Sequence, residues 1–327
     1  MSSSHTNSLN GLPPFIIGGA VFNYHYHSNP QSLPVEDILH HAFELGYNAI
    51  DTSPYYGPSE EILGHALSKL NVPRESYYIC TKAGRIKLDE FDYSRALVRQ
   101  SVLRSLKRLQ TTYLDLVYMH DIEFVTIDEV IEALKELQSL KDEGVVRNIG
   151  VSGYPIHFIY EVAMKWKQSN SKGTPLDAVM SYCHGCIQNN TLFDYETKLK
   201  TEAGVGKIMN GLILSMSLLR SQPTHVFHPA STALKVKVDE LAHNLKLEKG
   251  VELAELATKY AIYEWVVKRK LSIVLGVSNL HELNVAVDAF ELLKHNNGLD
   301  ETDAKLIKQF QSDLGDHFNE TWPSGHL

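Results

Sequence analysis

The chain has 327 residues, of which 43% are hydrophobic and 9% aromatic, enough for one large α/β domain or two ordinary ones. Its formal net charge of −8 gives no electrostatic reason to expect nucleic acid or a membrane surface as partner, and favours small neutral molecules. The three cysteines cannot form a disulfide framework, and the N-terminus lacks a secretory or mitochondrial targeting pattern. No apolar run approaches the roughly 20 residues of a membrane span, so we expect a cytoplasmic protein.

Eight short apolar runs alternate along the chain with amphipathic stretches. Runs this apolar, when they are joined through helices, predict parallel strands that are buried on both faces. The predicted strands are residues 15–20, 47–51, 77–82, 113–120, 145–152, 176–182, 205–214 and 271–278.

The stretches between these runs carry apolar residues at three- and four-residue spacing, which is the period of an α-helix. Gly46 and Gly144 directly follow two such stretches, where a glycine commonly ends a helix. The clearest predicted helices are residues 35–46, 59–70, 94–109, 127–144 and 255–270.

Eight strand–helix units predict an α/β fold, a closed (β/α)₈ barrel of the TIM type, formed as one domain over residues 1–327. The alternative is an open doubly wound sheet, which would need a ligand signature at its switch point. Gly18 and Gly19 do not supply one, because the third glycine and the following helix of a dinucleotide fingerprint are missing. Residues 215–250 form too long a segment for a plain loop and predict an extra helix over the barrel mouth. A further helix is expected at the C-terminus.

Four polar residues fall at the ends of successive predicted strands. Asp51, Lys82 and His120 end the second, third and fourth strands, and Tyr56 follows Asp51 in the stretch DTSPYYG. Because active sites of such barrels lie at the C-terminal ends of the strands, these side chains should meet at one rim. Each residue taken singly also has a purely structural explanation, as a surface charge, a core imidazole, a helix cap or packing.

Together the four residues suit acid–base chemistry. A free phenol has a pKa near 10, and a neighbouring Lys82 ammonium would favour the phenolate form of Tyr56 and lower that pKa. Asp51 would hold the ammonium, while His120 would orient a carbonyl or hydroxyl oxygen. We therefore expect Tyr56 to exchange a proton in a carbonyl–alcohol interconversion.

Longer stretches of sequence resemble a known family. DTSPYYGPSEEILGHAL, LDLVYMHD, GVVRNIGVSGY and VLGVSNLHEL are together similar to the aldo-keto reductases, over nearly the whole chain. The resemblance implies a (β/α)₈ barrel that binds an extended nicotinamide dinucleotide, with Asp51, Tyr56, Lys82 and His120 as the catalytic tetrad. ICTKAGR, SYCHGCIQNNTL, LSMSLLRSQ and HFNETWPSG resemble the sugar dehydrogenase branch. That branch implies NAD-dependent oxidation of an aldose (D-arabinose, or else L-galactose or L-fucose) at C1 to the aldonolactone.

The resemblance also implies cofactor contacts, but the chain departs from the family at several of those positions. Gly153 stands where asparagine is common, Ser181 where glutamine is common, and Leu212 and Ile213 where a Ser-Pro pair is usual. Backbone amides are expected to replace some of the lost side-chain contacts. The expected cofactor-binding residues are Gly19, Ser152, Gly153, Ser181, Asn210, Ser215, Gly276, Ser278 and Asn279.

Two further groups of residues have competing explanations. Tyr24 and His25 follow the first predicted strand and are expected to contact the sugar together with His120; the alternative is an exposed loop. Cys183 and Cys186 form a lone CxxC, and because no second ligand pair stands at zinc spacing, we expect packing and no metal site.

The resemblance implies that the adenosine end of the cofactor lies against the segment after the last strand, which here reads GVSNLHEL, so this segment bears on the choice between NAD and NADP. It carries no lysine or arginine to offset the charge of a 2′-phosphate, which favours NAD. The alternative is that Lys268, Arg269 or Lys270, just before the strand, supplies that charge.

Other functions also stay open at this point. One is an NADP-linked reductase of general aldehydes and ketones, and another is a non-catalytic barrel that serves as a binding subunit. The expected partner is a small sugar, and the expected state is a monomer or weak homodimer.

Overall fold

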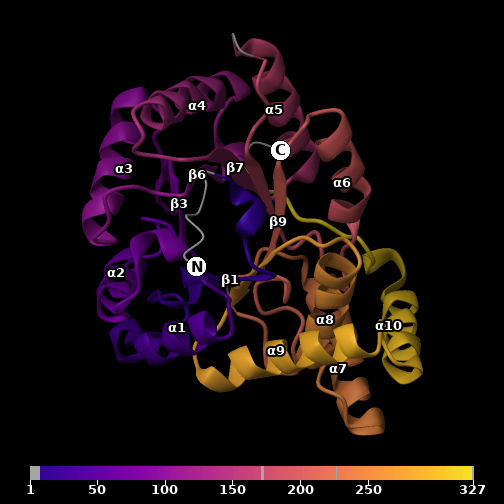
Figure 1. Cartoon of the computed structure of the whole chain (residues 1–327). Coiled ribbons are helices and arrows are strands. Elements are labelled where there is room, and N and C mark those ends of the chain that lie inside the picture. Colours follow the sequence, from indigo (N-terminus) through magenta and orange to yellow (C-terminus); the bar gives the residue numbers. More distant parts are fainter. Residues whose placement is uncertain (1–7, 171–172, 226, 326–327) are drawn as a thin grey trace.

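The computed structural model describes residues 8–170, 173–225 and 227–325, and in these ranges eight parallel strands close into a barrel (Figure 1). Their order around the barrel is β1-β10-β9-β8-β7-β6-β3-β2. The strands are β1 (Phe15–Gly18), β2 (Ala49–Asp51), β3 (Tyr78–Ala83), β6 (Leu116–His120), β7 (Ile149–Gly153), β8 (Ala178–Tyr182), β9 (Lys207–Gly211) and β10 (Ile273–Gly276). Each overlaps the run predicted for it, so the predicted (β/α)₈ barrel is confirmed.

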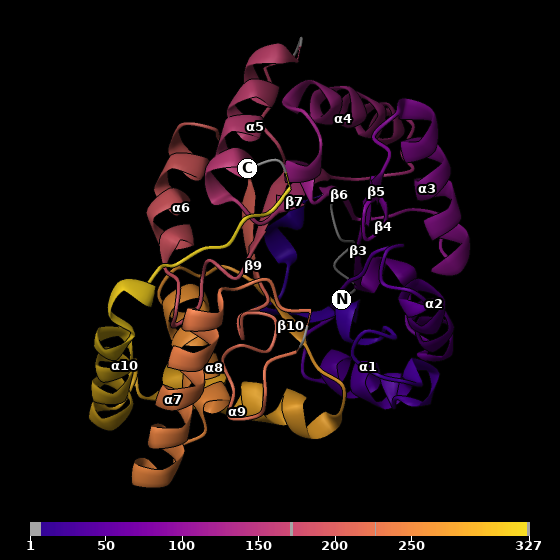
Figure 2. The ribbon, with the colours of Figure 1, turned by 180° about the vertical axis from the view of Figure 1, so that it is seen from behind.

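Helices surround the barrel on its outside (Figures 1 and 2). Those that follow barrel strands are α1 (Val35–Glu44), α2 (Ser59–Lys69), α3 (Arg95–Arg108), α4 (Ile127–Asp142), α5 (Ile156–Ser169), α6 (Thr191–Thr201), α8 (Leu253–Ala261) and α9 (Leu280–His295). Two more are α7 (Thr232–Lys249), after β9, and α10 (Glu301–Leu314), near the C-terminus. A small antiparallel hairpin of β4 (Arg85–Lys87) and β5 (Glu90–Phe91) follows β3.

Two predictions about helices need correction. The predicted helix 255–270 is α-helical only to Ala261 and continues as a π-helix, Ile262–Val267, in which the bulky Trp265 is fully buried and donates to the Ser272 carbonyl. The extra helix α7 exists, but it packs on α8 and α10 beside the barrel and not over its mouth. Its apolar residues find their partners there, and the loop that precedes it approaches the mouth instead.

Side chains alternate between the two faces of each barrel strand. Tyr118, Met180 and Met209 belong to a cluster in the barrel interior, whereas Val117 and Ile149 pack outward against the helices. The residues two positions beyond the interior ones therefore face the inside of the barrel at its C-terminal end. This alternation decides which predicted site residues can share one cavity.

The opposite end of the barrel is held by a buried carboxylate. Asp115, just before β6, pairs with Arg74 at 2.6 Å and with Arg147 at 3.3 Å, and it also accepts the Ile79 backbone N–H. These contacts tie the starts of β3, β6 and β7 together, far from the strand ends that carry the candidate site.

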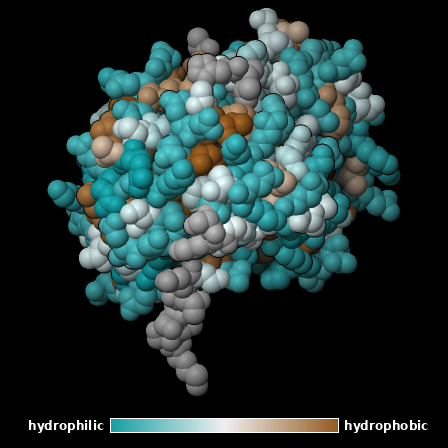
Figure 3. Space-filling model, turned by 90° about the horizontal axis from the view of Figure 1, so that it is seen from above, coloured by the Kyte–Doolittle hydropathy of each residue, from teal (hydrophilic) through white to brown (hydrophobic). Residues whose placement is uncertain are grey.

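No helix in the described ranges is both long enough and apolar enough to cross a bilayer. On the face shown in Figure 3, hydrophilic residues predominate and hydrophobic ones form only small groups.

We predict that Gly64→Ala destabilises the fold through the contact between α2 and α3. A Cβ atom at Gly64 would lie 2.1 Å from the Arg108 carbonyl oxygen and 2.8 Å from the Leu109 Cα. Because both are backbone atoms, the helices must separate, and overpacking of this kind costs about 1–3 kcal/mol. Urea unfolding should report this loss. Ser68→Ala, on the exposed face of the same helix, is the control and should change stability little; equal stability of both variants would contradict the prediction.

Candidate active site

The structure brings the four predicted catalytic residues together at the C-terminal end of the barrel. The Lys82 Nζ donates to the Asp51 Oδ1 at 2.5 Å and to the Thr52 carbonyl at 2.8 Å. The same nitrogen lies 4.9 Å from the centre of the Tyr56 ring, and the His120 ring lies 5.6 Å from that ring. Asp51, Lys82 and His120 share the inward-facing parity of their strands, which is why three separate elements converge here.

Charge and burial oppose each other in this group. Burial disfavours the Lys82 ammonium, but Asp51 and Tyr56 outweigh it and raise the pKa of Lys82, so the ammonium persists at neutral pH. Burial raises the pKa of the Tyr56 phenol, and Lys82 acts against that rise. Lys82 thus acts on the pKa of Tyr56 in the expected direction, towards a lower value. The pKa of Tyr56 is nevertheless above its ordinary value, because burial outweighs the effect of the lysine. The sequence alone could not reveal how strongly this site is desolvated.

Ser53, which the sequence reasoning missed, determines the tautomer of His120. The Ser53 Oγ accepts the Tyr55 N–H at 3.1 Å and lies 3.0 Å from the His120 Nδ1. Among the described residues its hydroxyl proton has no other acceptor, so it points at Nδ1. Burial lowers the pKa of His120 to about 3, so the ring is neutral and carries its proton on Nε2. That N–H is directed away from Ser53.

A second polar group, also missed, lies beside this tetrad. Arg85 and Asp121 form a mostly buried ion pair, and the Arg85 guanidinium lies 4.0 Å from the centre of the Tyr55 ring. The Asp121 Oδ2 is 3.5 Å from the His120 Nε2. Each residue of the pair stands just beyond a predicted catalytic residue, so their positions in the sequence were a usable signal.

The other half of the mouth carries glycines. Gly18, Gly211 and Gly276 end β1, β9 and β10, which are neighbours in the barrel, and they stand two positions beyond residues that face its interior. A Cβ at Gly211 would meet nothing closer than 3.5 Å. Across the mouth from these three strand ends, which carry no side chains, lie the inward-facing side chains of β2, β3, β6 and β7. Ser152 lies on the inner face of β7 within the same mouth.

Three of the predicted cofactor-binding residues lie on the outward-facing side of their strands. Gly153, Ser181 and Asn210 are in register on β7, β8 and β9, with outward parity. Ser181 Oγ is 3.2 Å from the His184 Nδ1, and the Asn210 amide donates to the Gly185 carbonyl at 2.7 Å. The Ser181 and Asn210 side chains hold the loop after β8. Their contact with a cofactor stays a prediction that the side-chain directions do not favour.

Close packing explains two further glycines. A Cβ at Gly153 would lie 2.5 Å from the Glu123 Oε2, and a Cβ at Gly19 would lie 2.5 Å from the Ser59 Oγ. Glu123 is buried and bridges the end of β7 to the C-terminal tail, accepting the Tyr154 N–H at 3.1 Å and the Ser324 hydroxyl at 2.8 Å. A side chain at position 153, such as the asparagine that is common in the resembled family, would therefore have to displace the Glu123 carboxylate.

The segment after β10 begins α9 with an acidic residue. The Ser278 N–H and hydroxyl donate to the Glu282 Oε2 at 2.7 and 3.0 Å, and Asn279 caps the helix by accepting the Glu282 N–H. The bases considered as an alternative precede β10, at its other end. Of these, Lys268 pairs with Glu264 and Arg269 with Glu196.

The loops around the mouth place the remaining predicted residues. Tyr24 is 57% exposed and accepts a hydrogen bond from Gln31, so its hydroxyl faces the surface. His25 is exposed as well; its ring contacts the Tyr55 ring edge-on and the Phe227 ring at a tilt of 42°. The missed residue Tyr26 is better buried, and burial together with the nearby Tyr56 raises the pKa of Tyr26 to about 12.

The segment beyond β9 and the C-terminal tail also reach this end of the barrel. Ser215 is buried, and its carbonyl accepts the His228 Nε2–H at 2.8 Å. The tail runs from α10 towards β7 (Figure 2), where Trp322 stacks on Tyr154 with ring centres 4.6 Å apart. Cys183 and Cys186 are buried free thiols, and no group of three or more metal-ligating side chains occurs within residues 8–170, 173–225 and 227–325.

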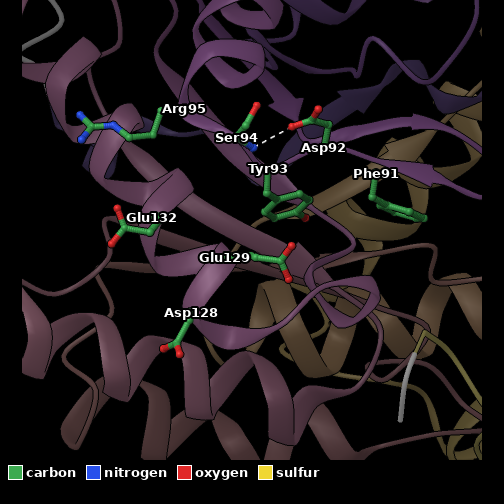
Figure 4. A pocket seen from close by; sticks show the side chains of 8 residues that line it. All are labelled: Phe91, Asp92, Tyr93, Ser94, Arg95, Asp128, Glu129 and Glu132. Atoms are coloured by element: carbon green, nitrogen blue, oxygen red, sulfur yellow. Dashed lines mark hydrogen bonds between the residues drawn. The ribbon is translucent and has the colours of Figure 1, made fainter.

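A cleft of about 650 Å³ lies outside the barrel, between the starts of α3 and α4 (Figure 4). Its lining includes the acidic Asp128, Glu129 and Glu132 of α4, on the far side of Tyr93 from the tetrad. Tyr93 separates the two spaces, and its hydroxyl donates to the His120 carbonyl at 2.6 Å. Tyr93 therefore both lines this cleft and holds the backbone of His120 in the candidate site.

The low pKa of His120 predicts a loss of stability in acid. Between pH 6.5 and 3 the unfolded chain binds a proton that buried His120 resists, so stability must fall as the pH falls. From pH 7 to pH 5 this one residue should contribute a loss of up to about 2 kcal/mol. Urea unfolding of His120→Asn should show a correspondingly smaller pH dependence. His281→Asn, at an exposed position of α9, should behave as the wild type; an unchanged slope for His120→Asn would refute the assignment.

Comparison with known proteins agrees with this geometry. A model of the Aldo/keto reductase family matches residues 14–307. The chain is 50% identical over 321 residues to D-arabinose 1-dehydrogenase of Saccharomyces cerevisiae, covering 97% of this chain and 95% of that protein. It is 37% identical over 287 residues to L-galactose dehydrogenase of Arabidopsis thaliana, covering 87% of this chain and 85% of that protein.

Solved structures share the fold at low sequence identity. An aldo-keto reductase of Bacillus halodurans has a TM-score of 0.65 and 23% identity, with 91% of each chain covered. Glycerol dehydrogenase of Gluconobacter oxydans has a TM-score of 0.63 and 20% identity, covering 97% of this chain and 95% of that one. The family model spans most of the chain, and the alignments with both sequence relatives cover most of those proteins. This chain therefore belongs to the aldo/keto reductase family of oxidoreductases, which use nicotinamide cofactors.

Proposed function

We propose that this chain oxidises an aldose at C1 to the aldonolactone with NAD as cofactor, and that D-arabinose is a substrate. The observation that carries the proposal is the buried Lys82–Asp51 pair directly under Tyr56, with His120 facing the same space. The substrate class is supported by the 50% identical relative named D-arabinose 1-dehydrogenase and by the relative named L-galactose dehydrogenase.

The side chains divide the work of removing a proton from the C1 hydroxyl. Tyr56 as phenolate accepts that proton, and the Lys82 ammonium stabilises the phenolate against its burial. His120 donates its Nε2–H to the C1 oxygen and orients it. NAD, when bound, would supply the acceptor for the hydride of C1, so that loss of the hydroxyl proton to Tyr56 and of this hydride would leave a carbonyl at C1. Asp51 keeps the lysine charged and in place throughout.

NAD would lie along the glycine half of the mouth. Ser152 and the backbone of Gly211 are suited to the nicotinamide end, while Gly276, Ser278 and Asn279 lie where the strand β10 leads towards the adenosine end. Glu282 at that end would repel a 2′-phosphate but can accept hydrogen bonds from ribose hydroxyls. This favours NAD over the NADP of the alternative reductase, and the complete tetrad argues against a non-catalytic subunit.

Tyr56→Phe tests the acid–base role. Loss of the phenol should lower kcat for D-arabinose by roughly 10²–10⁴-fold, the usual contribution of a general acid–base group. NADH binding, followed by its fluorescence, should survive. Tyr160→Phe, which removes an exposed hydroxyl bound to Glu202, is the matched control and should keep normal turnover. Near-normal turnover in a folded Tyr56→Phe protein would sink the mechanism.

Cofactor preference tests the assignment of the adenosine end. The wild type should have a higher kcat/KM with NAD than with NADP, because a 2′-phosphate carries close to two charges and meets Glu282. Glu282→Gln should narrow the gap, and Ser278→Arg should shift preference towards NADP. Glu301→Gln on α10, an exposed side chain, should leave the ratio unchanged. Equal or better use of NADP by the wild type would contradict this part of the proposal.

A further inference from the structure

The ion pair of Arg85 and Asp121 stands where a substrate held by His120 would extend. The Asp121 Oδ2 is 3.5 Å from the His120 Nε2, the atom assigned to the C1 oxygen. Tyr55, under the guanidinium, has its ring centre 5.9 Å from the His120 ring and 6.3 Å from the Tyr56 ring. Any group next to the reacting oxygen on this side therefore meets a carboxylate and a guanidinium.

The backbone fixes this arrangement. Asp121 has a left-handed conformation with φ 56°, which aspartate adopts more readily than most residues other than glycine and asparagine, and which turns the chain directly after β6. Its carboxylate is 3% exposed and the arginine side chain 13% exposed, so both charges are largely removed from water. Such a pair is costly unless further hydrogen bonds satisfy it.

The pair retains unused hydrogen-bonding capacity. Arg85 has five N–H groups, and in the described part of the chain three of them have acceptors: the Lys87 carbonyl, Asp121 and the Leu88 carbonyl. Asp121 accepts from Arg85 through Oδ2, and within the same ranges no donor reaches Oδ1. A ligand that both donates and accepts would complete this set.

We propose that Arg85 and Asp121 form a subsite for the C2 hydroxyl of the aldose, with the hydroxyl donating to Asp121 and accepting from Arg85. This inference rests on the proposed function, and it assigns a specificity-determining role to two residues outside the tetrad. Of the two oxygens next to C1–O1, the ring oxygen has no proton to give a carboxylate, whereas the C2 hydroxyl has one. A charged acceptor and donor on one hydroxyl also disfavour apolar aldehydes and alcohols, because the pair would then be desolvated without compensation.

The test compares D-arabinose with 2-deoxy-D-ribose, which differs from it only by lacking the C2 hydroxyl. A hydrogen bond to a charged group is worth roughly 10- to 100-fold in binding, so wild-type kcat/KM should favour D-arabinose by at least that factor. In Asp121→Asn and in Arg85→Met the ratio of the two kcat/KM values should fall to within a few-fold of one. The intrinsic reactivity of the two sugars cancels when the ratio is compared between wild type and variant.

Asp115→Asn supplies the matched control. Asp115 is equally buried and also paired with arginine, but it stands at the opposite end of the barrel. This variant should lose stability yet keep the wild-type ratio of sugars. NADH fluorescence and a thermal melt verify that each variant is folded and binds cofactor, and if Asp121→Asn does not fold, Arg85→Met and the wild-type comparison still decide the matter.

The possible results separate the two proposals. Failure of the wild type to oxidise either sugar would overturn the proposed function and this subsite with it. Equal use of both sugars by the wild type, or an unchanged ratio in the folded variants, would overturn the subsite alone. A ratio that collapses in Asp121→Asn and Arg85→Met but not in Asp115→Asn would establish it.

Discussion

The buried contact between Lys82 and Asp51 is the constraint on which the mouth of this barrel depends. An ammonium that is almost fully removed from water must have hydrogen-bond acceptors within reach, and here the end of β2 supplies the Asp51 carboxylate and the next residue, Thr52, a carbonyl. Losing one partner of such a pair costs about 3–5 kcal/mol, so β2 and β3 are held in register at their ends. The pair also fixes where positive charge meets the Tyr56 phenol. Stability and chemistry therefore rest on one contact.

Around this pair, single hydrogen bonds fix the orientation of the neighbouring groups. Ser53 directs its proton at His120 because the Tyr55 N–H already occupies its oxygen, and the imidazole is thereby left with its own proton on Nε2, on the side away from Ser53. Tyr93 holds the His120 backbone from outside the barrel. Asp121 turns back towards the same ring through its left-handed backbone. The orientation of one imidazole is thus determined from three directions.

Much of the fold could be predicted from sequence because its determinants are local. Apolar runs and helical periods locate the strands and helices, and the rule that barrel sites lie at strand ends brings Asp51, Lys82 and His120 to one rim. Other features needed three-dimensional information. The place of α7 depends on the apolar faces of α8 and α10, and the net pKa of Tyr56 depends on desolvation. The outward direction of Ser181 and Asn210 follows from strand parity, which shifts with a single residue of register.

The mouth is divided into a half built of side chains and a half built of backbone, and this division separates two kinds of evolutionary change. On the side of β3 and β6, Arg85 and Asp121 can be exchanged for residues of other size or polarity, which alters the choice of substrate. On the side of β1, β9 and β10, Gly18, Gly211 and Gly276 leave no side chain to exchange, and every substitution adds atoms. A change of side chain can therefore reshape the half lined by β3 and β6 while the backbone half keeps its form, so that the two halves can change independently.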